Sequence, residues 1–274
     1  MTTSRPRMSV AVIIPCHNEA EGMNYLRDRL ATAIPVIEAA GPWAVRVLLF
    51  DNGSTDDTLA RMRAVFGADP RYVIHHSPTN VGIGGSLRAG LTLISGDVIV
   101  GMDSDCTYDP EEVARLLERT AAGWDIVTGS PYHPQGGVVN VPEWRLFLSR
   151  GLSGLYRLAT PVKMWTYTAM FRAYRRPALE AIRWESDGFL STSEILVEAA
   201  AAGFTICEVP MMLHRRRFGV SKIRILRVIG DHLRYLFRVM TSRPLRRRLS
   251  TNFRPAPSAE LIPAGSMIPE RAFN

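Results

Sequence analysis

Short apolar runs alternate with longer amphipathic segments over the first half of the chain. The apolar runs are rich in β-branched residues, which is typical of buried strands, and the segments between them have helical spacing. We predict strands at residues 9–14, 45–50, 72–76, 98–102 and 125–128. We predict helices at residues 21–40, 87–94 and 111–121. This alternation predicts an α/β fold with a doubly wound, mostly parallel sheet and helices on both faces.

The pattern changes after residue 130. Residues 131–142 are rich in proline and glycine, so we expect a mobile loop there. Next we expect a helix at 143–158, a strand at 166–174, a helix opened by a capping box at 191–194 and a strand at 205–209. The chain is expected to comprise a globular domain over 1–222, a basic amphipathic segment over 223–250 and a disordered tail over 251–274.

Positive charge is concentrated near the C-terminus. The chain carries a net charge of +7, but residues 211–254 hold thirteen Lys or Arg against one acid, a net +12 that leaves −5 for the rest. Such a segment indicates contact with phosphates, in a nucleotide, a nucleic acid or an anionic lipid. Residues 223–240 have the spacing of an amphipathic helix. Its apolar face is expected to comprise Leu226, Ile229, Leu233, Leu236 or Phe237, and Met240.

Several classes of protein are excluded by the sequence. No apolar run approaches the length of a membrane span, and the run at 10–15 is too short for the core of a signal peptide. The three cysteines, Cys16, Cys106 and Cys207, lack metal-ligand spacing, so we expect reduced thiols in the cytoplasm. The glycine-rich segment 80–86 matches neither the dinucleotide fingerprint nor the phosphate-binding loop. Close helix packing, or a close approach of the backbone to the ligand, is enough to explain its glycines.

The strongest candidate for chemistry is a pair of carboxylates at the end of the predicted strand 98–102. Asp103 and Asp105 stand one residue apart in a loop at a carboxyl end of the sheet, where open α/β sheets bind ligands. In extended backbone these side chains point to the same side, and two close anions favour a cation between them. Mn²⁺ or Mg²⁺ is the natural occupant, and a solvated turn is the simpler alternative. Asp51 and Asn52 follow another strand and are expected to line the same cleft.

Eight short motifs, in this order along residues 9–222, resemble those of family 2 glycosyltransferases, in particular the polyprenyl-phosphate and dolichol-phosphate sugar transferases. They are Val-Ile-Ile-Pro-x-x-Asn-Glu (12–19), Asp-Asn-Gly-Ser-Thr-Asp (51–56), Gly-Asp-Val-x-x-x-Met-Asp-x-Asp (96–105), Gly-Ser-x-Tyr (129–132), Phe-Arg-x-Tyr-Arg-Arg (171–176), Gly-Phe (203–204), Glu-Val-Pro (208–210) and Gly-x-Ser-Lys (219–222). Each motif is weak alone, whereas the ordered set is highly specific.

The resemblance implies a GT-A fold that holds a nucleoside-diphosphate sugar at the carboxyl edge of the sheet. Asp103 and Asp105 would bind the metal that bridges the donor diphosphate. The resemblance places the other donor contacts at Pro15, Glu19, Asp51, Asn52 and Ser104. It places Arg145, Arg216 and Lys222 near donor or acceptor phosphates, with a solvated face as the alternative for each arginine.

The implied activity is metal-dependent, inverting transfer of a hexose to a polyprenyl phosphate or similar membrane-linked acceptor. The basic segment would then lie along an anionic membrane on its cytoplasmic face, and the alternative is an ordinary surface helix. Transfer to a soluble hydroxyl acceptor, or a non-catalytic anion-binding module, are the other interpretations. We expect no nucleic-acid partner.

Three positions depart from the family pattern: Thr107, Pro131 and Thr166 stand where glutamine, arginine and aspartate are usual. The usual general base is therefore not obvious. A phosphate acceptor is already an anion and needs no strong base, whereas a hydroxyl acceptor would need one, with Asp187 and Glu194 as the candidates.

Overall fold

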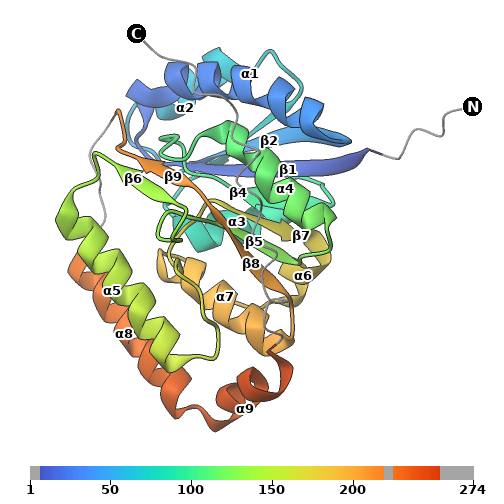
Figure 1. Cartoon of the computed structure of the whole chain (residues 1–274). Coiled ribbons are helices and arrows are strands. Elements are labelled where there is room, and N and C mark those ends of the chain that lie inside the picture. The colour runs from blue at the N-terminus through green and yellow to red at the C-terminus, as the bar shows by residue number, and fades with distance from the viewer. Residues whose placement is uncertain (1–6, 219–224, 254–274) are drawn as a thin grey trace, which may run out of the picture.

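A seven-stranded sheet forms the centre of the computed structural model, which describes residues 7–218 and 225–253 (Figure 1). Its strands are β1 (Met8–Cys16), β2 (Trp43–Asn52), β3 (Tyr72–Ser77), β4 (Val98–Gly101), β5 (Ile126–Ser130), β7 (Arg172–Arg175) and β8 (Ile206–Pro210). Their order is β3-β2-β1-β4-β7-β5-β8. Only β7 runs antiparallel to its neighbours β4 and β5. The predicted mostly parallel sheet is therefore confirmed.

Helices cover both faces of this sheet, as predicted. One face carries η1 (Ala20–Gly22), α1 (Met23–Ala40), α2 (Thr58–Phe66), η2 (Pro110–Glu112) and α4 (Val113–Ala121). The other carries α3 (Gly82–Leu93), α6 (Arg176–Ala181) and α7 (Leu190–Ala202). Side chains alternate along β1, so Val12 and Ile14 pack toward the first set and Ile13 toward the second. Burial of both faces explains why the strands are continuous apolar runs.

The strand predicted at 166–174 is largely wrong, because only its last three residues lie in β7. The backbone N–H groups of Trp165 and Thr166 each donate to the Glu208 carboxylate at 2.8 Å. The N–H of Tyr167 donates to the Ser153 hydroxyl at 3.3 Å. Side-chain oxygens thus accept the backbone N–H groups that would otherwise have paired with a neighbouring strand. The segment is therefore not a strand there, although its residue types favour one.

The glycine-rich segment 80–86 is not a separate loop, because α3 begins within it at Gly82 rather than at residue 87. The backbone N–H of Gly84 donates to the carbonyl of Asp187 at 2.6 Å. A Cβ at Gly84 would clash with the Ser186 carbonyl, and one at Gly90 would lie 2.5 Å from Ile13 Cδ1. The glycines therefore allow close helix packing, as the sequence suggested.

The capping box predicted at 191–194 is wrong. Helix α7 already begins at Leu190, and the Ser191 hydroxyl donates to the carbonyl of Gly188 at 2.7 Å. The Glu194 carboxylate instead accepts the backbone N–H groups of Glu185 and Ser186, at 3.2 and 2.9 Å. Glu194 is thus a buried anchor for the preceding loop.

A further group of elements lies outside the seven-stranded sheet. It consists of α5 (Glu143–Ala159), α8 (Ile225–Thr241), α9 (Arg243–Asn252) and a two-stranded parallel sheet of β6 (Gly137–Val139) and β9 (Met212–His214). Helices α5 and α8 lie side by side, and α9 packs against α7 (Figure 1). The expected loop at 131–142 is partly wrong because β9 supplies a partner for β6. The helix predicted at 143–158 is confirmed.

The predictions for the C-terminal segment and tail agree with the structure only in part. On α8, Leu236 is buried against the rest of the domain. Four other residues of the expected apolar face are exposed: Leu226, Leu233, Phe237 and Met240. The expected single apolar face is therefore only partly buried. Helix α9 reaches two residues into the predicted tail, of which 254–274 lie outside the described residues. The domain boundary at 222 also lies outside them and stays a prediction. Among the described helices, none is long and apolar enough to cross a bilayer.

Candidate active site

The acidic pair lies directly after β4, at the carboxyl edge of the parallel strands. The loop is held at its start by the Met102 N–H, which donates to the carbonyl of Ile13 at 3.1 Å. Within the loop the Thr107 N–H donates to Asp105 Oδ1 at 3.2 Å. Burial, and then the charge of Asp105, raises the pKa of the Asp103 carboxyl. Ionisation of either carboxyl in this partly buried loop makes ionisation of the other less favourable, and a bound cation would stabilise both negative charges.

Arg216 supplies a positive charge to this loop from a distant part of the chain. It follows β9, and its Nη2 lies 2.9 Å from Glu19 Oε1 while its Nε lies 3.2 Å from Asp105 Oδ2. The three side chains are only 16–19% exposed. The structure therefore brings together three of the predicted site residues, from the loops after β1, β4 and β9.

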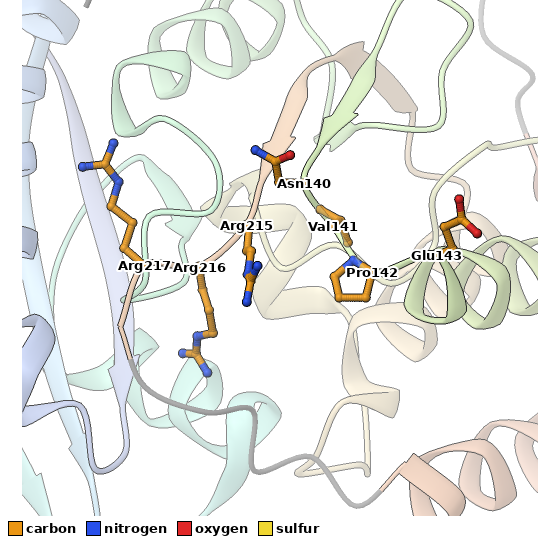
Figure 2. Close-up of a pocket in the computed structure, with 7 residues that line it drawn as sticks. All are labelled: Asn140, Val141, Pro142, Glu143, Arg215, Arg216 and Arg217. Carbon is orange, nitrogen blue, oxygen red and sulfur yellow. The ribbon is translucent and has the colours of Figure 1, made fainter. Parts of the chain in front are cut away.

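An open pocket of about 570 Å³ adjoins this ion-pair cluster (Figure 2). Its lining residues are Asn140, Val141, Pro142, Glu143, Arg215, Arg216 and Arg217. Arg217 stacks over the Tyr25 ring at 5.2 Å, whereas Arg215 has no ion pair among the residues that the structure describes. Arg216 belongs both to the acidic cluster and to this pocket. The pocket is suited to an anion such as a phosphate.

The carboxylates of the acidic loop suit one kind of divalent-metal site. Asp103 and Asp105 provide two carboxylates, and the described ranges 7–218 and 225–253 contain no cluster of three or more His, Cys, Asp or Glu that could form a closed cage. Mg²⁺ is commonly held by one or two carboxylates together with water and substrate phosphates. The residues present therefore fit a cation shared with a diphosphate, and they do not fit a structural metal site.

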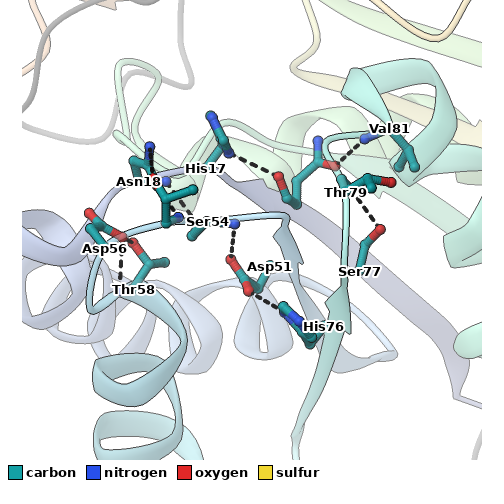
Figure 3. Close-up of polar contacts among 12 residues, drawn as sticks. His17, Asn18, Asp51, Ser54, Asp56, Thr58, His76, Ser77, Thr79 and Val81 are labelled. Atoms are coloured by element: carbon teal, nitrogen blue, oxygen red, sulfur yellow. Dashed lines mark hydrogen bonds and ion pairs between the residues drawn. The ribbon is translucent and has the colours of Figure 1, made fainter.

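Asp51 and Asn52, the last residues of β2, are both engaged by their neighbours (Figure 3). The fully buried Asp51 accepts from His76 Nδ1 at 2.6 Å and from the Ser54 N–H at 3.3 Å. The Asn52 amide accepts the Val81 N–H at 2.7 Å and donates to the carbonyl of Gly82 at 3.3 Å. Asn52 thus holds the start of α3, and a role for either side chain at the base or ribose stays a prediction.

The loop after β1 is tied to the loop after β2. His17 Nδ1 lies 2.9 Å from the Asn52 carbonyl, and the Thr55 N–H donates to the Asn18 side chain at 2.7 Å (Figure 3). The Glu19 N–H donates to the Thr58 hydroxyl at 2.8 Å. Asn18 has a positive φ of 53°, a conformation that asparagine tolerates better than most residues. These bonds fix the backbone from which Glu19 reaches Arg216.

The remaining predicted residues are placed as follows. Pro15 lies in β1 opposite Phe50, and Ser104 is buried in the loop between Asp103 and Asp105. The Arg145 guanidinium lies 5.6 Å from the centre of the Trp144 ring on the first turn of α5. Lys222 lies outside the described residues. None of these positions tests a role in binding.

The sequence did not identify His76 or the pair Arg215 and Arg217 as site residues. His76 faces Asp51 because the register of β2 and β3 pairs these two positions. A shift by one residue would have presented His75 instead, and no local pattern distinguishes the two. The basic run 215–217 was visible in the sequence, and a search for clustered arginines would have found all three.

The two candidate bases for a hydroxyl acceptor already have partners. Asp187 Oδ1 accepts from Arg88 Nη1 at 2.9 Å, and the Glu194 carboxylate holds two backbone N–H groups. Thr166, at a position where the family usually has aspartate, hydrogen-bonds the Ser130 hydroxyl at 2.8 Å inside the core.

Comparison with known proteins places this arrangement in a family. The family model described as Glycosyl transferase family 2 matches residues 11–183. The chain is 36% identical over 228 residues to polyprenol monophosphomannose synthase of Mycolicibacterium smegmatis, covering 81% of this chain and 83% of that protein. It is 35% identical over 224 residues to undecaprenyl-phosphate mannosyltransferase of Micrococcus luteus, covering 79% and 88%.

Solved structures agree on the fold. The crystal structure of glucosyl-3-phosphoglycerate synthase from Mycobacterium tuberculosis, in complex with Mn²⁺, uridine diphosphate and glucosyl-3-phosphoglycerate, matches with a TM-score of 0.63. The match covers 89% of this chain and 80% of that one at 19% identity, so it supports the GT-A fold alone. From the sequence matches, the chain belongs to glycosyl transferase family 2 and is a glycosyltransferase.

Proposed function

We propose that the protein is a metal-dependent, inverting enzyme that moves a hexose from a nucleoside-diphosphate sugar to a polyprenyl phosphate. The observation that carries this proposal is the double role of Arg216, which contacts Glu19 and Asp105 and also lines the pocket beside Pro142. A donor diphosphate at the acidic pair and an acceptor phosphate in the pocket would meet at this guanidinium. Relatives that are named for polyprenol and undecaprenyl phosphate support the lipid acceptor.

The proposed reaction is a single displacement. An acceptor phosphate oxygen forms the bond to the anomeric carbon as the bond from that carbon to the donor diphosphate breaks, which inverts the configuration. Arg215 and Arg216 would hold the acceptor phosphate and screen its charge from the departing diphosphate. A Mn²⁺ or Mg²⁺ ion held by Asp103 and Asp105 would supply positive charge to the leaving group.

No proton has to be removed from an ionised phosphate, so this reaction needs no general base. The contacts of Asp187 and Glu194 support this version, because both candidate bases are already paired with other groups. Use of Glu194 as the base would require its backbone contacts to open, since each of its carboxylate oxygens accepts one N–H group. We therefore favour the phosphate acceptor over the hydroxyl acceptor.

The acceptor's location in a membrane agrees with the surface of the α5–α8 pair. Helix α8 packs inward through Tyr235, Leu236 and Val239. The pair nevertheless exposes eight large apolar side chains: Trp144, Phe147, Leu155 and Leu158 on α5, and Leu226, Leu233, Phe237 and Met240 on α8. Exposed apolar area flanked by arginines is typical of a helix lying in a membrane interface. We propose peripheral attachment at the cytoplasmic face through this surface.

A transfer assay tests the catalytic proposal. Purified protein is incubated with a panel of labelled nucleoside-diphosphate hexoses, with undecaprenyl phosphate in vesicles or with soluble sugars as acceptors. We expect label in the lipid fraction that depends on Mn²⁺ or Mg²⁺ and is lost with chelator. Turnover on a soluble sugar with none on the lipid would overturn the proposal.

A second assay tests the attachment to membranes. The variant Phe147→Ser with Phe237→Ser should sediment less with vesicles of anionic lipid, because both side chains are more than two-thirds exposed on the α5–α8 surface. Val36→Ser, at a 40% exposed valine on α1, is the matched control and should sediment like the unmodified chain. Equal sedimentation of all three proteins would contradict the proposed surface.

A further inference from the structure

A second pocket, of about 450 Å³, lies where the end of α5 meets α9. Thr160 and Pro161 line it from one side, and Arg243, Arg246, Arg247 and Ser250 line it from the other. The first pocket lies at the opposite end of α5, at Glu143. A 17-residue helix is about 25 Å long, so the two pockets are separate sites.

The direction of the three arginines is set by how α9 packs. Their spacing, i, i+3 and i+4, places them on one helical face. Leu245 and Leu249 are buried, and the Asn252 amide donates to the carbonyl of Ala201 at 2.9 Å on α7. The arginine face is therefore held toward the end of α5 by the packing of the helix.

The positive charge of this pocket has no carboxylate partner within the described structure. Neighbouring arginines do have acids: Arg248 pairs with Glu198 at 3.3 Å and Arg238 with Glu185 at 3.0 Å. Across residues 7–218 and 225–253, no carboxylate lies within 4.0 Å of Arg243, Arg246 or Arg247. Three adjacent guanidiniums without an anion repel each other, so anion binding here would be favourable.

The carboxyl end of α5 does not explain these arginines either. Its carbonyl groups carry partial negative charge and could attract cations. However, Lys163 already takes that position, because its Nζ donates to the carbonyl groups of Arg157 and Thr160. Arg246 Nη1 also donates to the carbonyl of Met240 at the end of α8, over a long 3.5 Å, and the other donors of its guanidinium fork are left for a ligand.

We propose that this pocket is a second anion site, distinct from the catalytic one, that binds a phosphate group. Planar guanidinium forks match the oxygen geometry of phosphate, and three arginines line this pocket. The phosphate can come from an anionic phospholipid head group or from a free phosphate ester. Leu158 and Met240, on the last turns of α5 and α8, are both more than half exposed and would accommodate acyl chains. A lipid here would orient the enzyme on the membrane, a role that rests on the proposed function, whereas the anion site itself does not.

The test compares two variants of the full chain that remove the same charge. The pocket variant is Arg243→Gln, Arg246→Gln and Arg247→Gln. The control variant is Arg234→Gln, Arg238→Gln and Arg248→Gln, whose arginines each pair with an acid. The probes are phosphatidylcholine vesicles containing phosphatidylglycerol, followed by sedimentation, and inorganic phosphate, followed by calorimetry.

We expect the pocket variant to lose at least about tenfold in affinity for one or both probes, and the control less than about threefold. Loss for vesicles alone assigns the site to a lipid head group, and loss for inorganic phosphate identifies a site for free phosphate. Equal losses of affinity in both variants would show that binding depends only on the overall positive charge, and would contradict the proposed site. No loss in either variant would overturn it as well.

A second comparison adds an acid and keeps every arginine. Ser250→Glu places a carboxylate in the pocket and should weaken binding of the same probe, whereas Thr251→Glu, next to it but outside the lining, should not. Turnover on detergent-solubilised polyprenyl phosphate reports the proposed function independently and should be unchanged in all variants. Unaltered probe binding by Ser250→Glu would count against the site even if turnover is normal.

Discussion

Arg216 Nε lies 3.2 Å from Asp105 Oδ2, although 111 residues separate the two in the chain. The same buried Nε has no hydrogen bond of good geometry, whereas Nη2 lies 2.9 Å from Glu19. The contact with Asp105 is therefore mainly a charge interaction. A guanidinium held in this way neutralises the acidic loop and competes with any cation for Asp105.

We predict opposite effects of Arg216→Gln on metal binding and on turnover. Loss of the competing charge should strengthen Mn²⁺ binding to the free protein severalfold, while loss of the phosphate contact should lower kcat by about 100-fold. Calorimetry and the transfer assay measure the two effects. Arg27→Gln removes the same charge from the surface of α1, where the guanidinium pairs with Asp28 at 2.8 Å, and is the control. Weaker Mn²⁺ binding by Arg216→Gln would show that the arginine does not compete with the cation.

Asp105→Asn should abolish metal-dependent turnover, with a loss of at least about 100-fold, because one of two charged ligands is gone. The increase in Tm on adding Mn²⁺ should disappear as well, since binding to the native state alone produces that increase. Asp109→Asn is the matched control on the same loop, where the carboxylate lies 2.7 Å from Arg29 and 3.3 Å from His214. Full turnover by Asp105→Asn would remove the basis of the metal site.

His76→Gln should raise KM for the donor by about tenfold with little change in kcat, if Asp51 contacts the donor base as the resemblance implies. The His76 ring holds the buried Asp51 carboxylate through a 2.6 Å contact and would not touch the reacting atoms. Steady-state kinetics at varied donor concentration measure the effects on KM and on kcat separately. His75→Gln, at the neighbouring residue that packs on Phe50, should leave KM unchanged. A fall in kcat at constant KM would contradict the positioning role.

Protonation of His232 should lower the free energy of unfolding as the pH drops below about 6.5, whereas the buried Asp103 carboxyl, whose pKa is raised, contributes in the opposite direction. Burial lowers the pKa of the His232 side chain from 6.5 to about 4, and its Nδ1 lies 2.9 Å from the Tyr156 hydroxyl. The unfolded chain therefore binds a proton in this window that the native state does not. The loss due to His232 should reach roughly 3 kcal/mol between pH 7 and pH 4.

Denaturant titrations at several pH values measure this slope. His232→Gln should remove the contribution of this histidine to the slope, although the variant is less stable overall at pH 7 because of the change in packing. His133→Gln, at a less buried histidine, is the control and should retain most of the slope. An unchanged slope in His232→Gln would show that other groups cause the acid sensitivity.

Much of the sheet and the core of the candidate site could be predicted because the signals are local. The run Val98–Val100 followed by Asp103 and Asp105 predicted both a buried strand and an acidic loop, and β4 ends at Gly101 as expected within one residue. Parallel strands place such loops at one edge, so Asp51 and Asp105 could be assigned to the same edge. The helix at 143–158 was equally readable from its spacing.

Features that depend on distant partners could not be read in this way. Residues 166–171 have the composition of a strand, but Glu208 and Ser153 accept the backbone N–H groups of Thr166 and Tyr167. The apolar residues of α8 have one helical spacing, yet only some of them meet the domain, and Phe237 and Met240 stay exposed. The spacing shows which residues share a helical face and not what covers it.

The sequence by itself determined the α/β class, the order of the strands along the chain and the acidic pair, because hydrophobic periodicity and turn chemistry act over a few residues. Only the tertiary structure decided that Arg216 reaches Asp105, that His76 rather than His75 faces Asp51, and that the arginines of α9 meet the end of α5. Each of these contacts joins segments whose relative position depends on strand register and helix packing. Those are set by burial over the whole domain, and no short stretch of residues encodes them.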